Sequence, residues 1–207
     1  KMRDDLIEAE KLKQQLSLNL LQQQVNPHFL YNTLDNICAL AELDEKETLI
    51  QLVMNLSSFY RSSLSNGKMH ISIGQELEIS RAYLEILQIR YFHKFDFTIT
   101  CPEALKNYSC IKLLLQPILE NSIYHGIKGL DRHGILHIEA EDTGDCIRFT
   151  ISDNGRGFSK EDYEKIWQQD ADHFGIKSIQ QRILLYYGPG YGLSMESPQT
   201  GGCITVI

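Results

Sequence analysis

The spacing of apolar residues divides this 207-residue chain into a helical first third and a mixed remainder. Over residues 1–66, apolar residues recur every three or four positions, which predicts helix throughout. Before residue 24 the apolar stripe is narrow and the other faces are polar, so a coiled-coil seam is favoured over an ordinary amphipathic helix. The seam consists of Leu6, Ala9, Leu12, Leu16 and Leu20.

A second helix is predicted after an acidic segment in the middle of this region. Asp44 is a candidate N-cap, and Glu47, three positions on, would complete a capping box. The apolar residues from Leu49 to Leu64 then return at helical spacing. Two helices joined by a short loop form an antiparallel hairpin, which buries both apolar stripes only against a second copy. The first third therefore predicts a homodimeric four-helix bundle.

The period of the pattern changes after the hairpin. Apolar and polar residues alternate over several short stretches, as in strands with one buried face, and Thr143-Gly144-Asp145 turns one strand into the next. The fold class is therefore α+β, with the remainder an α/β sandwich: helices on one face of a mixed, mainly antiparallel sheet. We expect helices over residues 75–91, 110–125 and 176–187, and strands over 95–99, 136–141, 147–152, 193–196 and 203–206.

Composition narrows the class of protein. A net charge of −7 argues against a broad nucleic-acid-binding surface, and no nucleic acid is expected as a partner. The five cysteines are scattered and form no CxxC pair, which favours reduced thiols in a cytosolic domain. No run approaches the roughly 20 apolar residues of a membrane span. Because the sequence begins at Lys1 without a signal peptide, we expect a fragment of a longer chain.

An aspartate followed by glycines ends the second strand of the predicted hairpin. At a strand end, the carboxylate of Asp153 could accept a hydrogen bond from an exocyclic amine such as that of adenine. Gly155 and Gly157 would let the backbone approach a flat ring closely. Taken alone, the same stretch is more often a turn with a helix cap.

Polar residues interrupt the apolar helix expected over 110–125. Glu120, Asn121, Tyr124 and His125 fall along one side of it. One explanation is a helix edge that faces water, and the other is a metal-phosphate site. The amide oxygen of Asn121 suits Mg²⁺, which prefers oxygen ligands and shares phosphates, and Glu120 could act as a base or order a water on the metal.

A proline stands directly before a histidine at the end of the predicted seam. Asn26-Pro27 is typical of a helix start, with Asn as N-cap, or of a kink in one long helix. Either way His28 lies beside a broken hydrogen-bond ladder. At a true N-terminus the helix dipole would favour a neutral imidazole and, afterwards, a phosphoryl anion. An isolated histidine beside a kink is more often structural, and only the downstream motifs favour an acceptor.

Several motifs in order resemble those of the GHKL ATP-binding fold, which sensor histidine kinases, gyrase and MutL share. They are LLLQPILENSIYHG, DNGRG, FGIKSIQQRI and GGCITVI. NPHFLYNTLDNI and RAYLEILQIRYFHKF resemble the LytS/YesM-type class of sensor histidine kinases, and the resemblance covers about residues 22–207. It implies ATP and Mg²⁺ as cofactors. It also implies a signalling coiled coil over 1–24, a dimerisation and phosphotransfer hairpin over 25–70, and a catalytic domain over 71–207.

The resemblance implies a role for each matching residue. His28 would be phosphorylated, Asn121 would hold Mg²⁺, Asp153 would accept the adenine amine, and Glu120 is a candidate base. Asn32, one helical turn beyond His28, would orient a water that dephosphorylates the partner regulator. The other candidates for nucleotide binding are His125, Gly126, Gly155, Gly157, Gly175 at the start of a helix under the phosphates, Lys177, and Thr205 on the adenine side.

The sequence departs from the family pattern around the phosphates. Many relatives have lysine where Tyr124 stands, so His125 or Lys177 would have to supply the phosphate-binding cation. His173, at the end of the expected lid over residues 158–174, and Ser178, after it, replace a common glycine and asparagine. Phe29 stands where many other histidine kinases carry an acidic residue, which leaves the general base for His28 unassigned.

The resemblance implies a sensor histidine kinase core. It would phosphorylate its own histidine from Mg-ATP and pass the phosphoryl group to an aspartate in the receiver domain of a response regulator. We expect a homodimer, an upstream sensor with a transmembrane segment in the same chain, and a location on the cytoplasmic side of the plasma membrane. The alternatives are a GHKL ATPase that moves a partner, with Glu120 activating water, and a degenerate nucleotide-binding scaffold without phosphotransfer.

Overall fold

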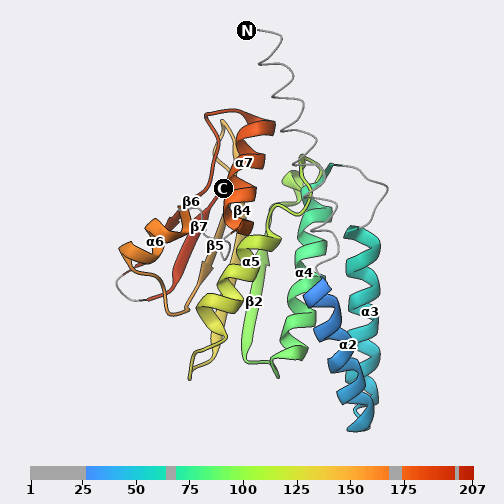
Figure 1. Ribbon diagram of the computed structural model, residues 1–207. Coiled ribbons are helices and arrows are strands. Elements are labelled where there is room, and N and C mark those ends of the chain that lie inside the picture. Colours follow the sequence, from blue (N-terminus) through green and yellow to red (C-terminus); the bar gives the residue numbers. More distant parts are fainter. Residues whose placement is uncertain (1–26, 64–68, 168–173, 199–200) are drawn as a thin grey trace, which may run out of the picture. The chain divides into compact units, whose positions relative to one another are not determined.

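The computed structural model describes residues 27–63, 69–167, 174–198 and 201–207, and Figure 1 shows their path. The chain divides into two compact units, Lys1–Lys46 and Glu47–Ile207. The predicted seam before residue 24 lies outside the described residues. So does Asn26, and the choice between a helix start and a kink at Pro27 therefore remains a prediction.

The described part of the first unit is helix α2 (Pro27–Glu42) followed by a turn. His28 is exposed on this helix. Inside it, the hydroxyl of Thr33 donates to the carbonyl of Phe29 at 2.7 Å. A helix begins readily with proline, because its missing N–H would have no partner in the first turn.

Helix α3 (Lys46–Ser63) confirms the second helix of the first third, but the predicted cap at Asp44 is wrong. Asp44 has φ of 59° and lies in the turn, where its carbonyl accepts from the N–H of Lys46 at 3.0 Å. An N-cap residue needs an extended backbone, whereas Asp44 adopts the left-handed conformation that aspartate tolerates. Glu45 therefore occupies the position before the helix.

A five-stranded sheet forms the centre of the second unit. Only β2 and β4 are parallel and every other neighbouring pair is antiparallel, as the alternating pattern predicted. Leu136, Ile138 and Ala140 are buried along one face of β4, whereas Ile135 before them and Glu139 between them are exposed. The strand order is β2 (Phe95–Thr100), β4 (Gly134–Asp142), β5 (Ile147–Asp153), β7 (Cys203–Val206) and β6 (Ser194–Glu196).

Three helices cover one face of this sheet (Figure 1): α4 (Ile73–Arg90), α5 (Gln116–Asn121) and α7 (Phe174–Tyr187). A capping box fixes the start of α4. The Ser72 hydroxyl accepts from the N–H of Gln75 at 3.2 Å, and the Gln75 side chain accepts from the N–H of Ser72 at 3.1 Å. The short helix α6 (Lys160–Trp167) lies beside α7. The remaining described elements are β1 (His70–Ser72), paired with β3 (Ser109–Ile111), and the single turn η2 (Glu103–Leu105).

The helix predicted over 110–125 is wrong in its first half. The chain there forms strand β3, passes Leu113 with φ of 54°, and becomes helical only at Gln116. A buried carboxylate explains the difference, because Glu76 accepts from the N–H groups of Leu113 at 2.8 Å and Leu115 at 2.9 Å. The guanidinium of Arg182 donates to the carbonyl of Leu113 at 3.3 Å. These side chains satisfy the backbone groups that a helix would otherwise have paired.

The second half of that helix is wound more loosely than predicted. Residues Ser122–Ile127 form a π-helix, η3, directly after α5. The N–H of Lys128 donates to the carbonyl of Ile123, five residues back, at 2.8 Å. Such segments occur often at functional sites.

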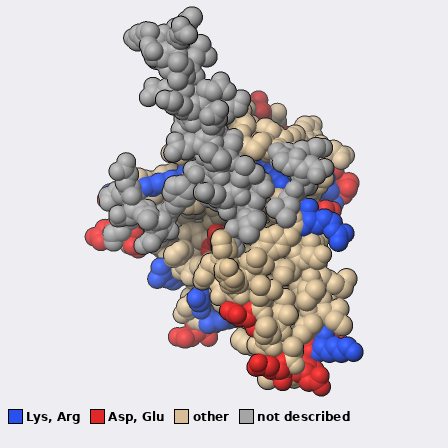
Figure 2. All heavy atoms as spheres, turned by 45° about the vertical axis from the view of Figure 1, so that its right-hand side comes forward, with Lys and Arg blue, Asp and Glu red and all other residues tan. Residues whose placement is uncertain are grey.

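Charged side chains of both signs are interspersed on the face drawn in Figure 2, with blue and red groups close together at its lower end. Among the described helices, none is both long and apolar enough to cross a membrane.

Candidate functional site

A cavity of about 340 Å³ lies where the end of β5 meets α5 and η3. Two elements far apart in sequence supply its predicted residues. The helical side contributes Asn121, His125 and Gly126, and the turn after β5 contributes Asp153 and Gly157. The fold therefore brings together the two motifs on which the sequence interpretation depended.

One oxygen of Asp153 is fixed by the backbone around it. Its Oδ1 accepts from the N–H of Gly155 at 2.9 Å and, across the sheet, from the N–H of Cys203 at 3.2 Å. Its Oδ2 is buried and has no hydrogen-bond partner of good geometry among the described residues. Burial raises the pKa of the Asp153 carboxyl, and the nearby Ser122 hydroxyl together with the N–H groups of Gly155 and Cys203 opposes that rise. A buried acceptor without a partner fits a ligand that donates a hydrogen bond.

The turn after Asp153 is held against the end of η3 by its backbone. The N–H of Arg156 donates to the carbonyl of Gly126 at 3.1 Å, and the N–H of Gly202 donates to the carbonyl of Gly155 at 2.9 Å. Gly157 has φ of 69°, a conformation that side chains strain. Glycines thus allow three segments of backbone to meet at the floor of the cavity.

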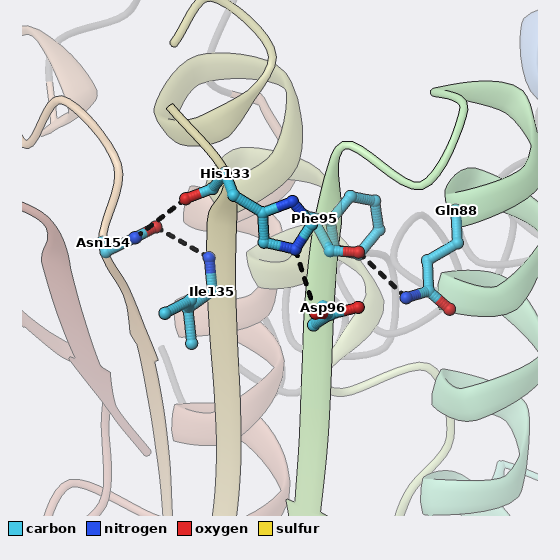
Figure 3. Close-up of polar contacts among 6 residues, drawn as sticks. All are labelled: Gln88, Phe95, Asp96, His133, Ile135 and Asn154. Carbon is cyan, nitrogen blue, oxygen red and sulfur yellow. Dashed lines mark hydrogen bonds and ion pairs between the residues drawn. The ribbon is translucent and has the colours of Figure 1, made fainter. Parts of the chain in front are cut away.

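Asn154 anchors this turn to the neighbouring strand, as Figure 3 shows. Its amide oxygen accepts from the N–H of Ile135 at 2.7 Å, and its amide nitrogen donates to the carbonyl of His133 at 3.1 Å. The ring of His133 lies 3.0 Å from the carboxylate of Asp96 on β2. Asn154 is therefore a structural residue: its side chain holds the strand end that carries Asp153.

A smaller cavity of about 150 Å³ adjoins the first. Asn121 and His125 border both cavities. The smaller one is also lined by Glu120, Tyr124 and Gly175, the last of which lies in the first turn of α7. A helix N-terminus favours anions, because its N–H groups and dipole point toward them.

Polar neighbours hold the two larger side chains of this smaller cavity. The Oε1 of Glu120 accepts from the amide of Gln116 at 3.0 Å and from the hydroxyl of Tyr83 at 3.3 Å. The hydroxyl of Tyr124 accepts from the guanidinium of Arg90 at 3.1 Å, and the ammonium of Lys128 lies 5.8 Å from its ring centroid. Although Tyr124 stands where many relatives carry lysine, two cations therefore lie directly beside it.

The residues present fit a nucleotide with a hydrated magnesium ion. The buried Oδ2 of Asp153 matches an amine donor, and the glycine-lined floor leaves room for a flat ring. Within the described ranges, no group of three or more histidine, cysteine or acidic residues could hold a metal by itself. A single amide oxygen from Asn121 suits an ion that takes its other ligands from phosphates and water, as Mg²⁺ does.

Not every predicted residue lines these cavities. Lys177 lies on α7 and lines neither of them, and Thr205 is buried on β7 with its hydroxyl 3.6 Å from the sulfur of Cys203. Cys203 itself lines the larger cavity, as does Phe158. No local pattern singles out Cys203, because its place depends on its pairing opposite Asp153 in the sheet.

The remaining predicted residues lie in the first unit. His28 is exposed on α2, and Asn32 follows it one helical turn later.

The segment expected to form a lid, residues 158–174, contains α6 and the rings of Phe158 and Tyr163, whose centroids stack at 5.9 Å. Its residues 168–173, including His173, lie outside the described ranges.

Comparison with known proteins matches two family models to successive parts of the chain. The family model described as "Histidine kinase" matches residues 16–95. The model described as "Histidine kinase-, DNA gyrase B-, and HSP90-like ATPase" matches residues 108–206.

Individual relatives extend this likeness over nearly the whole chain. Sensor histidine kinase YesM of Bacillus subtilis (strain 168) is 31% identical over 99% of this chain and 35% of its own length. Sensor histidine kinase BtsS of Escherichia coli (strain K12) is 33% identical over 87% of this chain and 31% of its own length. The chain thus spans about a third of these relatives.

A solved structure shares the fold. The histidine kinase domain of the blue-light activated histidine kinase EL346 from Erythrobacter litoralis aligns with a TM-score of 0.50 and 18% identity. The alignment covers 93% of this chain and 94% of that one.

Proposed function

This chain belongs to the histidine kinases, since it carries their kinase and ATPase domains, and on that premise we propose that it transfers the γ-phosphoryl group of Mg-ATP to His28. The phosphoryl group then passes to an aspartate in the receiver domain of a response regulator. The domain boundaries at 24/25 and 70/71 are part of this proposal, as is the signalling role of the first segment.

One observation carries the proposal: Asn121 and His125 border both cavities. The larger cavity offers an acceptor for a base amine at Asp153, and the smaller one offers a carboxylate at Glu120 and a helix start at Gly175. The order of these groups, from Asp153 in the larger cavity through Asn121 to Glu120 and Gly175 in the smaller one, matches the order of base, metal-bridged phosphates and reacting phosphorus in ATP.

Each residue then has a defined task. The Oδ2 of Asp153 would accept a hydrogen bond from the adenine amine, while its Oδ1 remains fixed by backbone N–H groups. Asn121 would contribute its amide oxygen to Mg²⁺, and the N–H groups at the start of α7 near Gly175 would favour the phosphates. When bound, ATP would supply the phosphoryl group and Mg²⁺ would neutralise the charge that develops on it. Glu120 would order a water on the metal or accept a proton.

The acceptor is an exposed imidazole on a separate unit. The unprotonated ring nitrogen of a neutral His28 can attack the γ-phosphorus in line, and ADP leaves as the bond from that phosphorus to the β,γ-bridging oxygen breaks. Lys177 and Thr205 line neither cavity, so their part in binding would require a change at the cavity edge.

Membership of the histidine kinases also suggests the binding partners of this chain. We propose a homodimer through the helices of the first third, a receiver domain as phosphoryl acceptor, and an upstream sensor that anchors the protein at the plasma membrane. The chain itself would then be the cytoplasmic portion. Signals would reach His28 through the segment at 1–24.

Incubation with γ-labelled ATP and Mg²⁺ tests the proposal. Wild type should acquire label that is lost in acid and kept in base, the behaviour of phosphohistidine. His28→Gln and Asn121→Ala should acquire none. His133→Gln is the matched control, because His133 is half exposed and lines neither cavity, so it should be labelled like wild type. Label retained in His28→Gln would exclude that acceptor, and free phosphate without phosphoprotein would indicate the ATPase alternative.

A further inference from the structure

Helix α4 stands directly behind the smaller cavity. Two of its side chains reach residues that line this cavity: Tyr83 reaches Glu120, and Arg90 reaches Tyr124. Positions 83 and 90 are seven residues apart, which places them on the same face of a helix after two turns. One face of α4 therefore supports the wall that would meet the reacting phosphate.

Tyr83 is unusually well placed to fix the carboxylate of Glu120. Its side chain is 1% exposed, and its hydroxyl lies 3.3 Å from Oε1. Burial raises the pKa of Tyr83, and the neighbouring charge of Glu120 raises it further, so the phenol keeps its proton and donates to the carboxylate. Gln116, four residues before Glu120 on the same helix, supplies the second donor at 3.0 Å.

The ring of Tyr83 is in turn held by α3. The ring centroids of Phe59 and Tyr83 lie 5.8 Å apart with their planes tilted by 39°, and Phe59 is buried. Aromatic pairs at this separation contribute packing beyond their buried area. A chain of contacts therefore runs from Phe59 on α3, through Tyr83 on α4, to Glu120 beside Asn121.

A glutamate side chain has three rotatable bonds, so its carboxylate keeps one orientation only if its neighbours impose it. A group that must orient a water or accept a proton acts efficiently only within a narrow range of positions. Of the two donors given above, Gln116 moves with Glu120 on the same helix, whereas Tyr83 fixes the carboxylate relative to a different element.

We infer that Tyr83 is a positioning residue for phosphoryl transfer: its hydroxyl aligns the Glu120 carboxylate, and Phe59 of α3 sets the position of its ring. This inference rests on the proposed kinase function. It also makes the contact between α3 and α4 a point at which a change in the first of these helices alters the rate of transfer without altering nucleotide binding.

Steady-state labelling of the full chain tests the inference through Tyr83→Phe, which removes the hydroxyl and keeps the ring. Because a hydrogen bond to a charged group contributes about one to two powers of ten to an equilibrium, the maximal rate should fall about tenfold. The KM for ATP and the affinity for a fluorescent nucleotide should stay within twofold of wild type. Tyr187→Phe is the matched control, because it likewise removes a hydrogen-bonded hydroxyl, which accepts from the N–H of Ile111 at 2.9 Å, and Tyr187 lines neither nucleotide cavity.

A double-mutant cycle separates positioning from a general loss of structure. If Tyr83 acts through Glu120, Tyr83→Phe should change the rate little in a Glu120→Gln background. Phe59→Leu should lower the maximal rate in the same direction as Tyr83→Phe, again with nucleotide affinity kept. An equal tenfold loss in both backgrounds, or a parallel loss of rate and nucleotide affinity, would show a merely structural role.

The inference and the proposed function fail differently. Wild type that is labelled normally while Tyr83→Phe behaves like Tyr187→Phe would overturn the inference and leave the kinase function intact. Wild type without any acid-labile label would overturn the proposed function and the inference with it. An unchanged rate in Phe59→Leu would show that Phe59 of α3 does not set the position of the Tyr83 ring.

Discussion

Gly155 lies so close to Gly126 that a Cβ built on Gly155 would stand 2.7 Å from the Cα of Gly126. The same Cβ would also stand 2.7 Å from Oδ1 of Asp153. Both neighbours are tightly placed, one as backbone and the other as a carboxylate fixed by two N–H groups. Any side chain at position 155 must therefore push apart the helix end and the strand end that form the floor of the larger cavity.

Gly155→Ala should consequently impair nucleotide binding and cost about 1–3 kcal/mol of folding stability, the usual effect of overpacking. Fluorescent-nucleotide titration and thermal melting measure the two effects. Gly129→Ala serves as control, since a Cβ there meets nothing within 4 Å. Equal nucleotide affinity in the two variants would contradict the close contact described above.

Asp153→Asn should separate nucleotide binding from stability. The amide can keep an oxygen for the N–H groups of Gly155 and Cys203, but it presents an N–H₂ donor where the adenine amine needs an acceptor. Affinity for ATP should fall at least about tenfold, as expected when a buried charge-assisted hydrogen bond becomes a clash of donors. Calorimetric titration measures this loss, and Asp96→Asn, whose carboxylate is exposed, should bind like wild type.

The pH dependence of ATP binding and of stability in wild type should report the protonation of Asp153. Burial raises the pKa of Asp153 above its ordinary value of 3.8, so lowering the pH protonates it early and weakens ATP binding. A carboxyl with a raised folded-state pKa contributes stability below its ordinary pKa and loses it as the pH rises through the folded value. Nucleotide-free Asp153→Asn should therefore be at least as stable as wild type at neutral pH. Melting curves of both proteins across pH 4–8 test this, and a clearly less stable variant would refute it.

Asn32→Ala should leave autophosphorylation intact and slow the dephosphorylation of the partner regulator. Asn32 follows His28 by one turn of α2, from where its amide could orient the attacking water. Labelling of the kinase by γ-labelled ATP measures the first rate, and loss of label from purified phosphorylated regulator measures the second. Dephosphorylation at the wild-type rate would reject the role of Asn32.

Glu76→Ala should destabilise the second unit by about 3 kcal/mol or more. The change leaves the N–H groups of Leu113 and Leu115 unpaired and removes the negative charge beside the buried Arg182. Urea unfolding followed by circular dichroism measures the loss. Glu78→Ala, at an exposed position on the same helix, should change stability by less than about 0.5 kcal/mol.

Much of the sheet domain can be predicted from the sequence, because each of its long strands has one buried face. The hairpin of β4 and β5 follows from strict alternation, and Asn121 and Asp153 meet as their motifs implied. The region before α5 differs from the prediction, because its leucine spacing resembles that of a helix. The residues that prevent it, Glu76 and Arg182, are far away in sequence and carry charges that no local pattern assigns to the interior.

The loose winding of η3 makes the site depend on the length of a segment as well as on its residues. In an α-helix each residue turns the chain by about 100°, whereas a π-helix spreads one turn over more residues. Deleting Ile123 would let the segment rewind as ordinary helix. Gly126 would then rotate away from Arg156, from whose N–H its carbonyl accepts, and the base and phosphate contacts would no longer be aligned, although every side chain that lines the two cavities was still present.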